Sequence, residues 1–170
     1  MDTQLTTNTP PAGENAAAAP PDGHRWEHAG NAWGRQARDW ACLFEHYAVD
    51  VILAMFDRLP VRRGTELLDV ACGSGLAIRM ADGLGARVSG LDAAEPLIEI
   101  ARARTPGGDI RVGDMFALPW AAESFDAVTA VNGIWGGCEG ALAEAYRVLR
   151  PRGGIAISFG GCLLYTYPSP

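Results

Sequence analysis

The side chains best placed to bind a ligand follow short apolar runs of the sequence. Asp69 opens the segment 69–75, with the sequence DVACGSG, in which small residues let the backbone approach a ligand closely. Asp92 closes a second apolar run, 19 residues after Gly73. An acidic side chain at this distance from a glycine-rich turn usually binds ribose hydroxyls in nucleotide-binding βαβ units. Together, the turn and the aspartate indicate a ligand that contains adenosine.

The glycine spacing separates two kinds of adenosine ligand. A dinucleotide-binding turn follows the pattern G-x-G-x-x-G, whose third glycine lets the helix pack closely beside the pyrophosphate. Here Gly73 and Gly75 fit the first two positions, but Ile78 occupies the third. The spacing therefore disfavours an enzyme that depends on NAD(P) or a similar nucleotide, which stays open as an alternative.

The elements that must position these residues alternate between strands and helices. Apolar runs predict five strands, at 67–70, 87–91, 109–112, 125–131 and 155–159. Helical patterns lie at 76–83, 96–104 and 141–149. Such alternation is typical of an α/β fold, in which helices cover both faces of a parallel sheet. Ligands bind beyond the carboxyl ends of the strands, which is where we expect Asp69 and Asp92 to lie.

The N-terminal part of the chain has a different composition. Residues 1–23 are rich in Pro, Ala, Thr and Gly and offer little apolar surface, so we expect a disordered tail. Residues 24–63 form a helical region, in which apolar side chains such as Leu43, Tyr47 and Met55 recur every three or four residues. We expect two amphipathic helices here, ending before the next proline.

Composition and charge exclude several classes of partner. A net charge of −6 and a pI near 5.0 provide no basic surface for nucleic acid. No apolar run reaches the roughly 20 residues of a membrane-spanning helix, and the start has no secretory signal, so we expect a cytoplasmic protein. The cysteines lie far apart and the histidines lack metal-ligand spacing, so neither a metal site nor a disulfide scaffold is expected.

Four motifs follow one another along the chain, at 67–75, 88–92, 113–120 and 148–151. In this order they resemble the motifs of class I S-adenosylmethionine (SAM)-dependent methyltransferases, most closely the small-molecule group that includes quinone-biosynthesis enzymes. The resemblance covers about residues 32–160. It implies a Rossmann-like, doubly wound parallel sheet with strand order 3-2-1-4-5, preceded by N-terminal helices. The SAM-binding domain would span residues 64–161.

The resemblance implies that the first turn lies beside the methionine part of the cofactor. The matching positions are Asp69, Ala71, Cys72, Gly73 and Gly75. Ala71 stands where the family most often has glycine, which adds one methyl group and is expected to be a mild change. As an alternative, Asp69 would only cap the turn that follows it.

The resemblance implies further contacts at the ends of the later strands. Asp92 would accept hydrogen bonds from both ribose hydroxyls through its two oxygens, and Ala93 would flank the adenine. Asp114 would accept a hydrogen bond from the adenine amine, while Met115 offers its backbone N–H and a soft contact with the ring. Asn132 would lie near the methionine carboxylate and the methyl group. As structural alternatives, Asp92 would be a charge at a helix end, Asp114 would form a turn and Asn132 would end a strand.

The acceptor side of the site is less defined. The resemblance implies transfer of a methyl group to a small-molecule acceptor by in-line displacement, with no catalytic base assigned. Trp33 and Trp40 would pack in the core or form a lid over the sulfonium by cation–π attraction. A SAM-binding module without catalysis stays open as an alternative.

The end of the chain departs from the family pattern. Relatives complete the sheet with two further strands, which we expect to be missing here. Residues 162–170 form a non-native-looking tail that does not continue the motifs. The fifth strand is therefore expected to be an exposed edge.

Overall fold

The computed structural model of the chain describes residues 25–134, 138, 140–159 and 163–168. The tail predicted at 1–23 lies outside these residues. Within them, six strands form one sheet in the order β3-β2-β1-β4-β5-β6. The strands are β1 (Glu66–Val70), β2 (Arg87–Asp92), β3 (Asp109–Val112), β4 (Phe125–Val131), β5 (Leu149–Phe159) and β6 (Leu163–Pro168).

The first five strands are parallel, and their order is the one predicted from the sequence. β1 lies between β2 and β4, and β3 and β5 extend the sheet outward on the two sides. All five carboxyl ends therefore meet at one edge of the sheet. The strand order reverses direction between β1 and β4, and a crevice at such a switch point is where open α/β sheets bind ligands.

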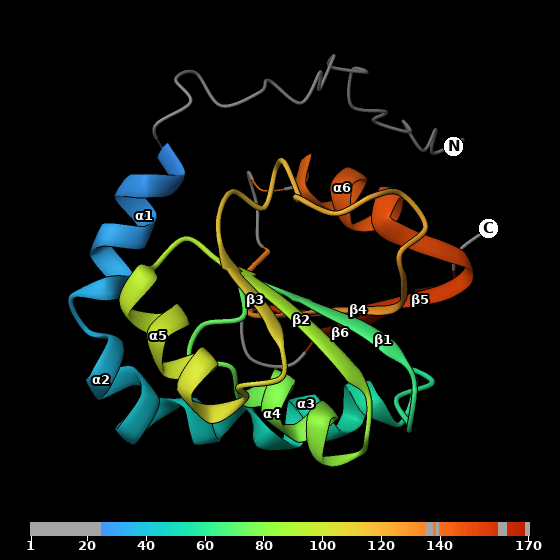
Figure 1. The fold of residues 1–170 in the computed structure, drawn as a ribbon, viewed down its shortest axis with the longest axis horizontal. Helices are drawn as coiled ribbons and strands as arrows, with labels where there is room; N and C mark the ends of the chain where they lie inside the picture. The colour runs from blue at the N-terminus through green and yellow to red at the C-terminus, as the bar shows by residue number, and fades with distance from the viewer. Residues whose placement is uncertain (1–24, 135–137, 139, 160–162, 169–170) are drawn as a thin grey trace, which may run out of the picture.

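Helices cover both faces of the sheet (Figure 1). α3 (Val49–Phe56), α4 (Leu76–Gly83) and α5 (Glu95–Arg104) lie on one face, and α6 (Gly140–Val148) lies on the other. The predicted helices at 76–83, 96–104 and 141–149 agree with α4, α5 and α6 to within one residue at each end. No helix in the described part of the chain is long and apolar enough to cross a bilayer.

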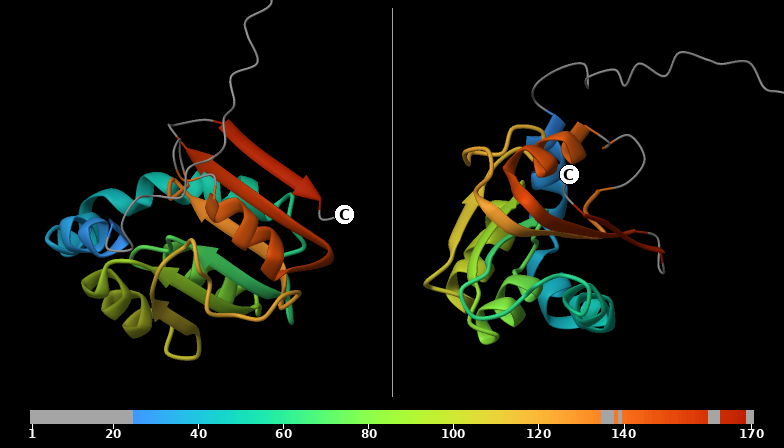
Figure 2. Two further views of the ribbon diagram at one scale, coloured as in Figure 1. Left: turned by 90° about the horizontal axis from the view of Figure 1, so that it is seen from above. Right: turned by 90° about the vertical axis from the view of Figure 1, so that its right-hand side faces the viewer.

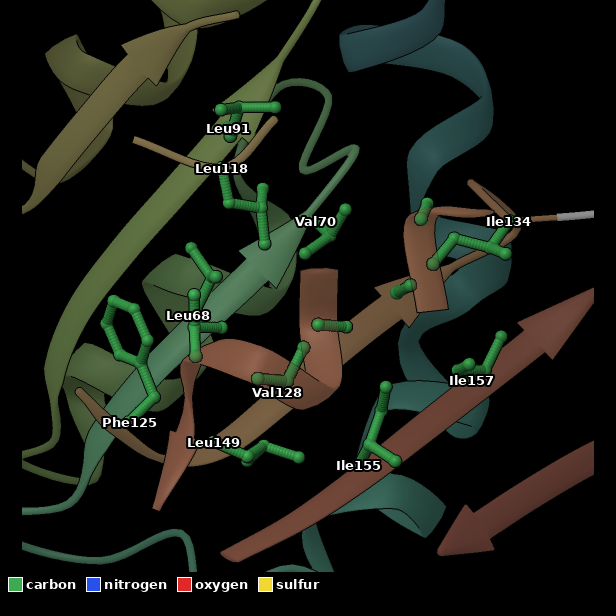
Figure 3. Packing of buried hydrophobic residues seen from close by; sticks show 14 residues of the cluster. Leu68, Val70, Leu91, Leu118, Phe125, Val128, Ile134, Leu149, Ile155 and Ile157 are labelled. Atoms are coloured by element: carbon green, nitrogen blue, oxygen red, sulfur yellow. The ribbon is translucent and has the colours of Figure 1, made fainter. Parts of the chain in front are cut away.

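The apolar core holds the central strands in a fixed position. Figure 3 shows Leu68 of β1, Val128 of β4 and Ile155 of β5 on the same face of the sheet. These side chains are at most 1% exposed. The opposite face buries Leu67 and Ala156 against α3, α4 and α5. Because each large apolar side chain contributes about 1.5–3 kcal/mol on full burial, the strand ends are anchored on a rigid scaffold.

The N-terminal helical region is irregular. α1 (Arg25–Gly34) and α2 (Ala37–Asp39) are followed by a π-helical turn η1 (Trp40–Phe44) and a 3₁₀ turn η2 (Glu45–Ala48), which lead into α3. The prediction of two amphipathic helices is therefore wrong in detail. Met55 is fully buried, but Leu43 is 57% exposed and Tyr47 is 76% exposed. Because π and 3₁₀ turns differ from 3.6 residues per turn, the apolar stripe does not continue on one face.

The C-terminal edge of the sheet differs from the prediction. The sequence predicts that the fifth strand begins at residue 155, but β5 already begins at Leu149 and contains a bulge opposite β4, with Arg152 at φ 70°. β6 pairs antiparallel with β5, as the two red strands of Figure 2 show. The expected exposed edge at the fifth strand is therefore wrong, because residues of the predicted tail pair with it. The segment LLYTYP has aromatic residues and a β-branched residue that favour a strand.

Candidate ligand-binding site

A cavity of about 460 Å³ opens at the carboxyl ends of the central strands. Its size is typical of small-molecule sites. Nine of the ten residues predicted for the site line it, and these are Asp69, Ala71, Cys72, Gly73, Asp92, Ala93, Asp114, Met115 and Asn132. The sequence motifs thus meet at one place, although they are spread over 64 positions of the chain.

Gly75 is the predicted site residue that does not line the cavity. It precedes α4 with a left-handed φ of 82°, which glycine adopts without steric cost. A Cβ atom at this position would lie 2.8 Å from the Cβ of Ala101 in α5. Gly75 therefore lets α4 and α5 pack closely, and it supports the turn without facing the ligand space.

Ala71 has a left-handed backbone conformation, with φ 57°. This conformation brings Cβ close to the carbonyl oxygen that follows and costs an L-residue roughly 1–2 kcal/mol. The expectation that alanine is a mild change here is therefore wrong. The turn keeps its shape at a cost in stability that glycine would avoid.

Asp69 is buried at the end of β1, with 2% of its surface exposed. Its Oδ1 accepts a hydrogen bond from the hydroxyl of Thr129 at 2.6 Å. The pKa of Asp69 is raised to about 7. Burial is the main cause, the Thr129 hydrogen bond partly offsets it, and the negative charge of Asp92 adds to the rise. The group is therefore poised between its neutral and charged forms near neutral pH, and a cation in the cavity would favour the carboxylate.

Asp92 is held by the backbone on two sides. Its Oδ2 accepts the N–H of Gly73 at 2.8 Å, and its Oδ1 accepts the N–H of Ala94 at 2.9 Å. Burial raises the pKa of Asp92, while hydrogen bonds from the backbone of Ala94, Gly73 and Ala93 lower it. Each carboxylate oxygen has a second lone pair, so both oxygens can also accept a hydrogen bond from a ligand.

Asp114 shapes the loop that follows β3. Its Oδ1 accepts the N–H of Phe116 at 2.9 Å, and its carbonyl accepts the N–H of Ala117 at 3.1 Å. The alternative of a turn-forming aspartate is therefore present in the structure. The same turn brings Met115 and Phe116 to the cavity wall.

Asn132 follows β4 in a left-handed conformation, with φ 56°. Its N–H donates to the carbonyl of Ser158 at 2.8 Å, and its Oδ1 accepts from the Ser158 hydroxyl at 3.4 Å. Asparagine tolerates this backbone region better than most residues. Asn132 thus turns the chain away from the sheet and joins the ends of β4 and β5 at the cavity.

The N-terminal helices form a second wall of the cavity that the sequence motifs did not assign. Trp26, Trp33, Trp40 and Glu45 all line it. The rings of Trp33 and Trp40 meet edge to face, with centroids 5.4 Å apart. The sequence marked both tryptophans as lid or core residues, but no local pattern marked Glu45.

The charge of the cavity distinguishes between ligands. Among the described residues, the charged side chains that line it are carboxylates, and these are Glu45, Asp69, Asp92 and Asp114. No arginine or histidine of the described residues lines it. Burial raises the pKa of the Cys72 thiol well above its usual range, so this group is neutral. The site therefore suits a cation with hydrogen-bond donors and disfavours a diphosphate.

A model of the methyltransferase-domain family matches residues 68–157. The chain belongs to this family. The match includes the turn after β1, Asp92, Asp114 and Asn132, and it begins after the helices that form the second wall. The family match thus includes the cavity wall at the strand ends but not the wall that the N-terminal helices form.

Two curated methyltransferases are similar to the chain. A ubiquinone/menaquinone biosynthesis C-methyltransferase of Paracoccus denitrificans is 42% identical over 114 residues, which cover 61% of this chain and 46% of the relative. The malonyl-[acyl-carrier protein] O-methyltransferase of Salmonella typhimurium is 34% identical over 132 residues, which cover 75% and 51% of the two chains. The chain thus spans about half the length of the curated relatives it matches.

A solved structure shows the same fold. The crystal structure of the [4+2]-cyclase SpnF superposes with a TM-score of 0.66 and 20% sequence identity, over 78% of this chain and 59% of the other. At this identity the similarity describes the fold alone. Because that protein is named as a cyclase, the fold does not by itself determine the reaction, which must be argued from the site.

Proposed function

We propose that the chain binds S-adenosylmethionine in this cavity and transfers its methyl group to a small-molecule acceptor. The observation that supports this most is the set of carboxylates at the carboxyl ends of β1, β2 and β3, with no basic side chain among the described lining residues. SAM carries a sulfonium and an ammonium group, whereas NAD carries two phosphates. A buried acidic cavity attracts the first ligand and repels the second.

The described residues fit the parts of the cofactor. Asp92 would receive the ribose hydroxyls, because its carboxylate is already oriented by two backbone N–H groups and keeps a free lone pair on each oxygen. Ala93 and Met115 would flank the adenine. Asp114 would receive the adenine amine through the oxygen that Phe116 does not use.

The turn after β1 would hold the methionine part. Ala71, Cys72 and Gly73 line the cavity with small side chains or none, so the backbone can approach the ligand. Asp69 would face the ammonium group from the end of β1. Asn132 would lie at the methyl group and the methionine carboxylate, since it is placed by the ends of β4 and β5. Gly75 would act only through the packing of α4.

Catalysis would depend mainly on alignment. When bound, SAM supplies an activated methyl group, and an acceptor atom forms the new bond to carbon as the carbon–sulfur bond breaks, leaving S-adenosylhomocysteine (SAH). The chain's own residues would orient the reactants and exclude water, and the tryptophans of the N-terminal wall serve the second purpose. The named relatives methylate at carbon and at oxygen, so the acceptor atom is left open.

Calorimetry with this chain tests the proposal. We expect SAH to bind with a dissociation constant in the micromolar range and NAD to give no measurable heat. Tighter binding of NAD than of SAH, or no SAH binding by a chain whose circular dichroism shows it folded, would contradict it. If SAH binds but no labelled methyl group passes from SAM to any small molecule of an extract, the chain is a binding module.

A further inference from the structure

The helices before β1 cover the cavity as a separate segment. We define the N-terminal cover as residues 25–56, from α1 to α3. It contributes seven residues to the cavity wall, which are Trp26, Ala29, Trp33, Trp40, Glu45, Ala48 and Ile52. The cover lies before the match to the methyltransferase domain. Its position over the cavity therefore depends on contacts between its residues and those of the domain.

The cover is attached at the amino end of α5 by close packing. A Cβ atom on Gly30 of α1 would lie 2.1 Å from the carbonyl oxygen of Ala93, and one on Gly34 would lie 3.1 Å from Pro96. Ala37 of α2 is buried against Ala94 and Leu97. This contact lies beside the loop that lines the cavity after β2, and Figure 1 shows α1 and α2 alongside α5.

A second attachment lies at the carboxyl end of α5 and consists of charges. Arg104 donates through Nη1 to both carboxylate oxygens of Glu45, at 2.7 and 2.8 Å. The same nitrogen donates to the carbonyl of Ser74 at 3.1 Å, and Nη2 donates to the carbonyl of Ala41 at 3.4 Å. The Ser74 hydroxyl also donates to Glu45. One guanidinium thus joins the cover to the glycine-rich turn.

This ion pair is more buried than others in the chain. The side chains of Glu45 and Arg104 are 13% and 24% exposed, whereas those of Glu66 and Arg87 are 25% and 68% exposed. Removing one partner of a buried pair leaves the other charge poorly solvated, so such pairs hold their geometry more strictly than exposed ones.

The irregular helix explains how Glu45 reaches the turn. Glu45 begins the 3₁₀ turn that follows the π turn η1, and it faces the cavity while Leu43 and Phe44 remain about half exposed. In a regular α-helix, Glu45 would have a different orientation relative to Leu43 and Phe44. Ser74 in turn adjoins Gly73, whose N–H holds the Asp92 carboxylate.

We infer that Glu45 is a positioning residue for the cofactor site, which acts through Arg104 and Ser74 to keep the cover closed on the glycine-rich turn. The inference rests on the proposed function. Ligand bound between the turn and the cover stabilises the closed arrangement, and the closed arrangement holds the turn that orients Asp92. Binding and closure are therefore coupled through one carboxylate.

The test compares two glutamates that each pair with an arginine. Glu45→Gln removes the charge at the cover, and Glu66→Gln removes a matched charge from the exposed pair at the opposite end of β1. We expect SAH to bind roughly tenfold more weakly to Glu45→Gln and within twofold of wild type to Glu66→Gln. Ser74→Ala keeps the ion pair but removes one donor, so we expect a smaller loss of about threefold.

Hydrogen exchange separates positioning from stability. In the wild type and in Glu66→Gln, SAH should slow exchange across residues 25–56, and in Glu45→Gln this protection should be lost while β1 and β4 stay protected. Arg104→Lys should keep SAH affinity closer to that of the wild type than Glu45→Gln does, because one nitrogen, Nη1, makes the contacts with Glu45 and Ser74 and an ammonium group keeps the positive charge. Unchanged SAH affinity in Glu45→Gln, or equal losses in both glutamine variants, would overturn the inference.

A measurement without ligand separates failure of the inference from failure of the proposed function. We expect residues 25–56 of unliganded Glu45→Gln to exchange faster than those of the wild type. If the wild type binds no SAH, the proposed function fails, but this comparison still decides whether Glu45 attaches the cover. Equal exchange in the two unliganded proteins would show that it does not.

Discussion

The carboxylates at the two ends of the sheet have different partners. At the carboxyl ends, Asp69 and Asp92 accept hydrogen bonds from the Thr129 hydroxyl and from backbone N–H groups. At the amino ends, Asp109 pairs with Arg111 at 2.6 Å and Asp126 pairs with Arg150 at 2.9 Å. Arginines thus neutralise Asp109 and Asp126, whereas Asp69 and Asp92 have no arginine partner among the described residues and are left for a ligand.

The pKa values follow this division. Burial raises the pKa of both Asp69 and Asp92. The Arg111 hydrogen bond lowers the pKa of Asp109. Burial alone would raise the pKa of Asp126, but the Glu66 N–H and Arg150 outweigh it, so the net shift is downward. The charged forms of Asp109 and Asp126 therefore stabilise the fold, whereas the charged forms of Asp69 and Asp92 destabilise it.

The largest expected effect is the pH dependence of Asp69. Its pKa is about 7 in the folded chain, whereas an unfolded aspartate titrates near 4. Between these values the folded state binds more protons, so the free energy of unfolding falls as the pH rises, by up to about 4 kcal/mol. We expect Asp69→Asn to lose this slope when urea denaturation is compared at pH 5 and pH 8.

Asp109→Asn serves as the control for this effect. The pKa of Asp109 is lowered, so its contribution to stability is present above the unfolded pKa and is lost only in acid. The slope between pH 5 and pH 8 should therefore match that of the wild type. Equal slopes in the wild type and Asp69→Asn would contradict the assignment of this proton to Asp69.

The next effect concerns ligand affinity. Asp92→Ala should weaken SAH binding by about 1.5–3 kcal/mol, because it removes charge-assisted hydrogen bonds to the ribose and the acceptor for the Gly73 N–H. Calorimetry measures the loss. Asp126→Ala removes a carboxylate of the same kind from the amino end, and it should lower stability with no change in SAH affinity. A similar loss of affinity in both variants would remove the distinction between the ends.

A smaller effect concerns backbone strain, which is present at both ends of the sheet, at Ala71 and at Arg152. Ala71→Gly should raise the free energy of unfolding by roughly 0.5–1 kcal/mol, because the relief of the left-handed conformation exceeds the entropy that glycine adds to the unfolded chain. Arg152→Gly at the amino end, with φ 70°, should behave alike. In contrast, Ala81→Gly within α4 should cost about 1 kcal/mol. Chemical denaturation of the three variants tests this order.

The smallest effect is expected at the exposed Glu66–Arg87 pair. Its nitrogen and oxygen lie 2.5 Å apart, but the Arg87 side chain is 68% exposed, so solvent screens the attraction. Glu66→Gln should change stability by less than about 0.5 kcal/mol, and 1 M salt should abolish the difference. A larger loss in denaturation experiments would mean that the amino end is more rigid than its exposure indicates.

Much of the fold was predictable because local patterns determine it. The strands at 109–112 and 125–131 have the predicted bounds, since apolar runs between turn signals leave few alternatives in a sheet buried on both faces. The N-terminal region was less predictable, because apolar spacing does not distinguish an α-helix from π and 3₁₀ turns. β6 was missed because its segment lies outside the family motifs.

The site residues that belong to the family motifs were predictable from the sequence. Asp92 follows its strand at the expected spacing from Gly73, and the structure joins the two by a hydrogen bond. Gly75 has the expected backbone freedom, but it faces α5 and not the cavity. The motif could not predict this, because it does not indicate toward which neighbour a glycine faces. Glu45 was missed because its partner Arg104 lies 59 residues away and neither residue belongs to a pattern.

The contact between Gly133 and Ala71 bears on how this site could change during evolution. A Cβ atom on Gly133 would lie 2.3 Å from the Cβ of Ala71, whereas the next nearest atom, the carbonyl oxygen of Val70, lies at 3.3 Å. A side chain at position 133 therefore becomes acceptable only after Ala71 has become glycine. The order of the two substitutions matters, and the loops after β1 and β4 must diverge as a pair.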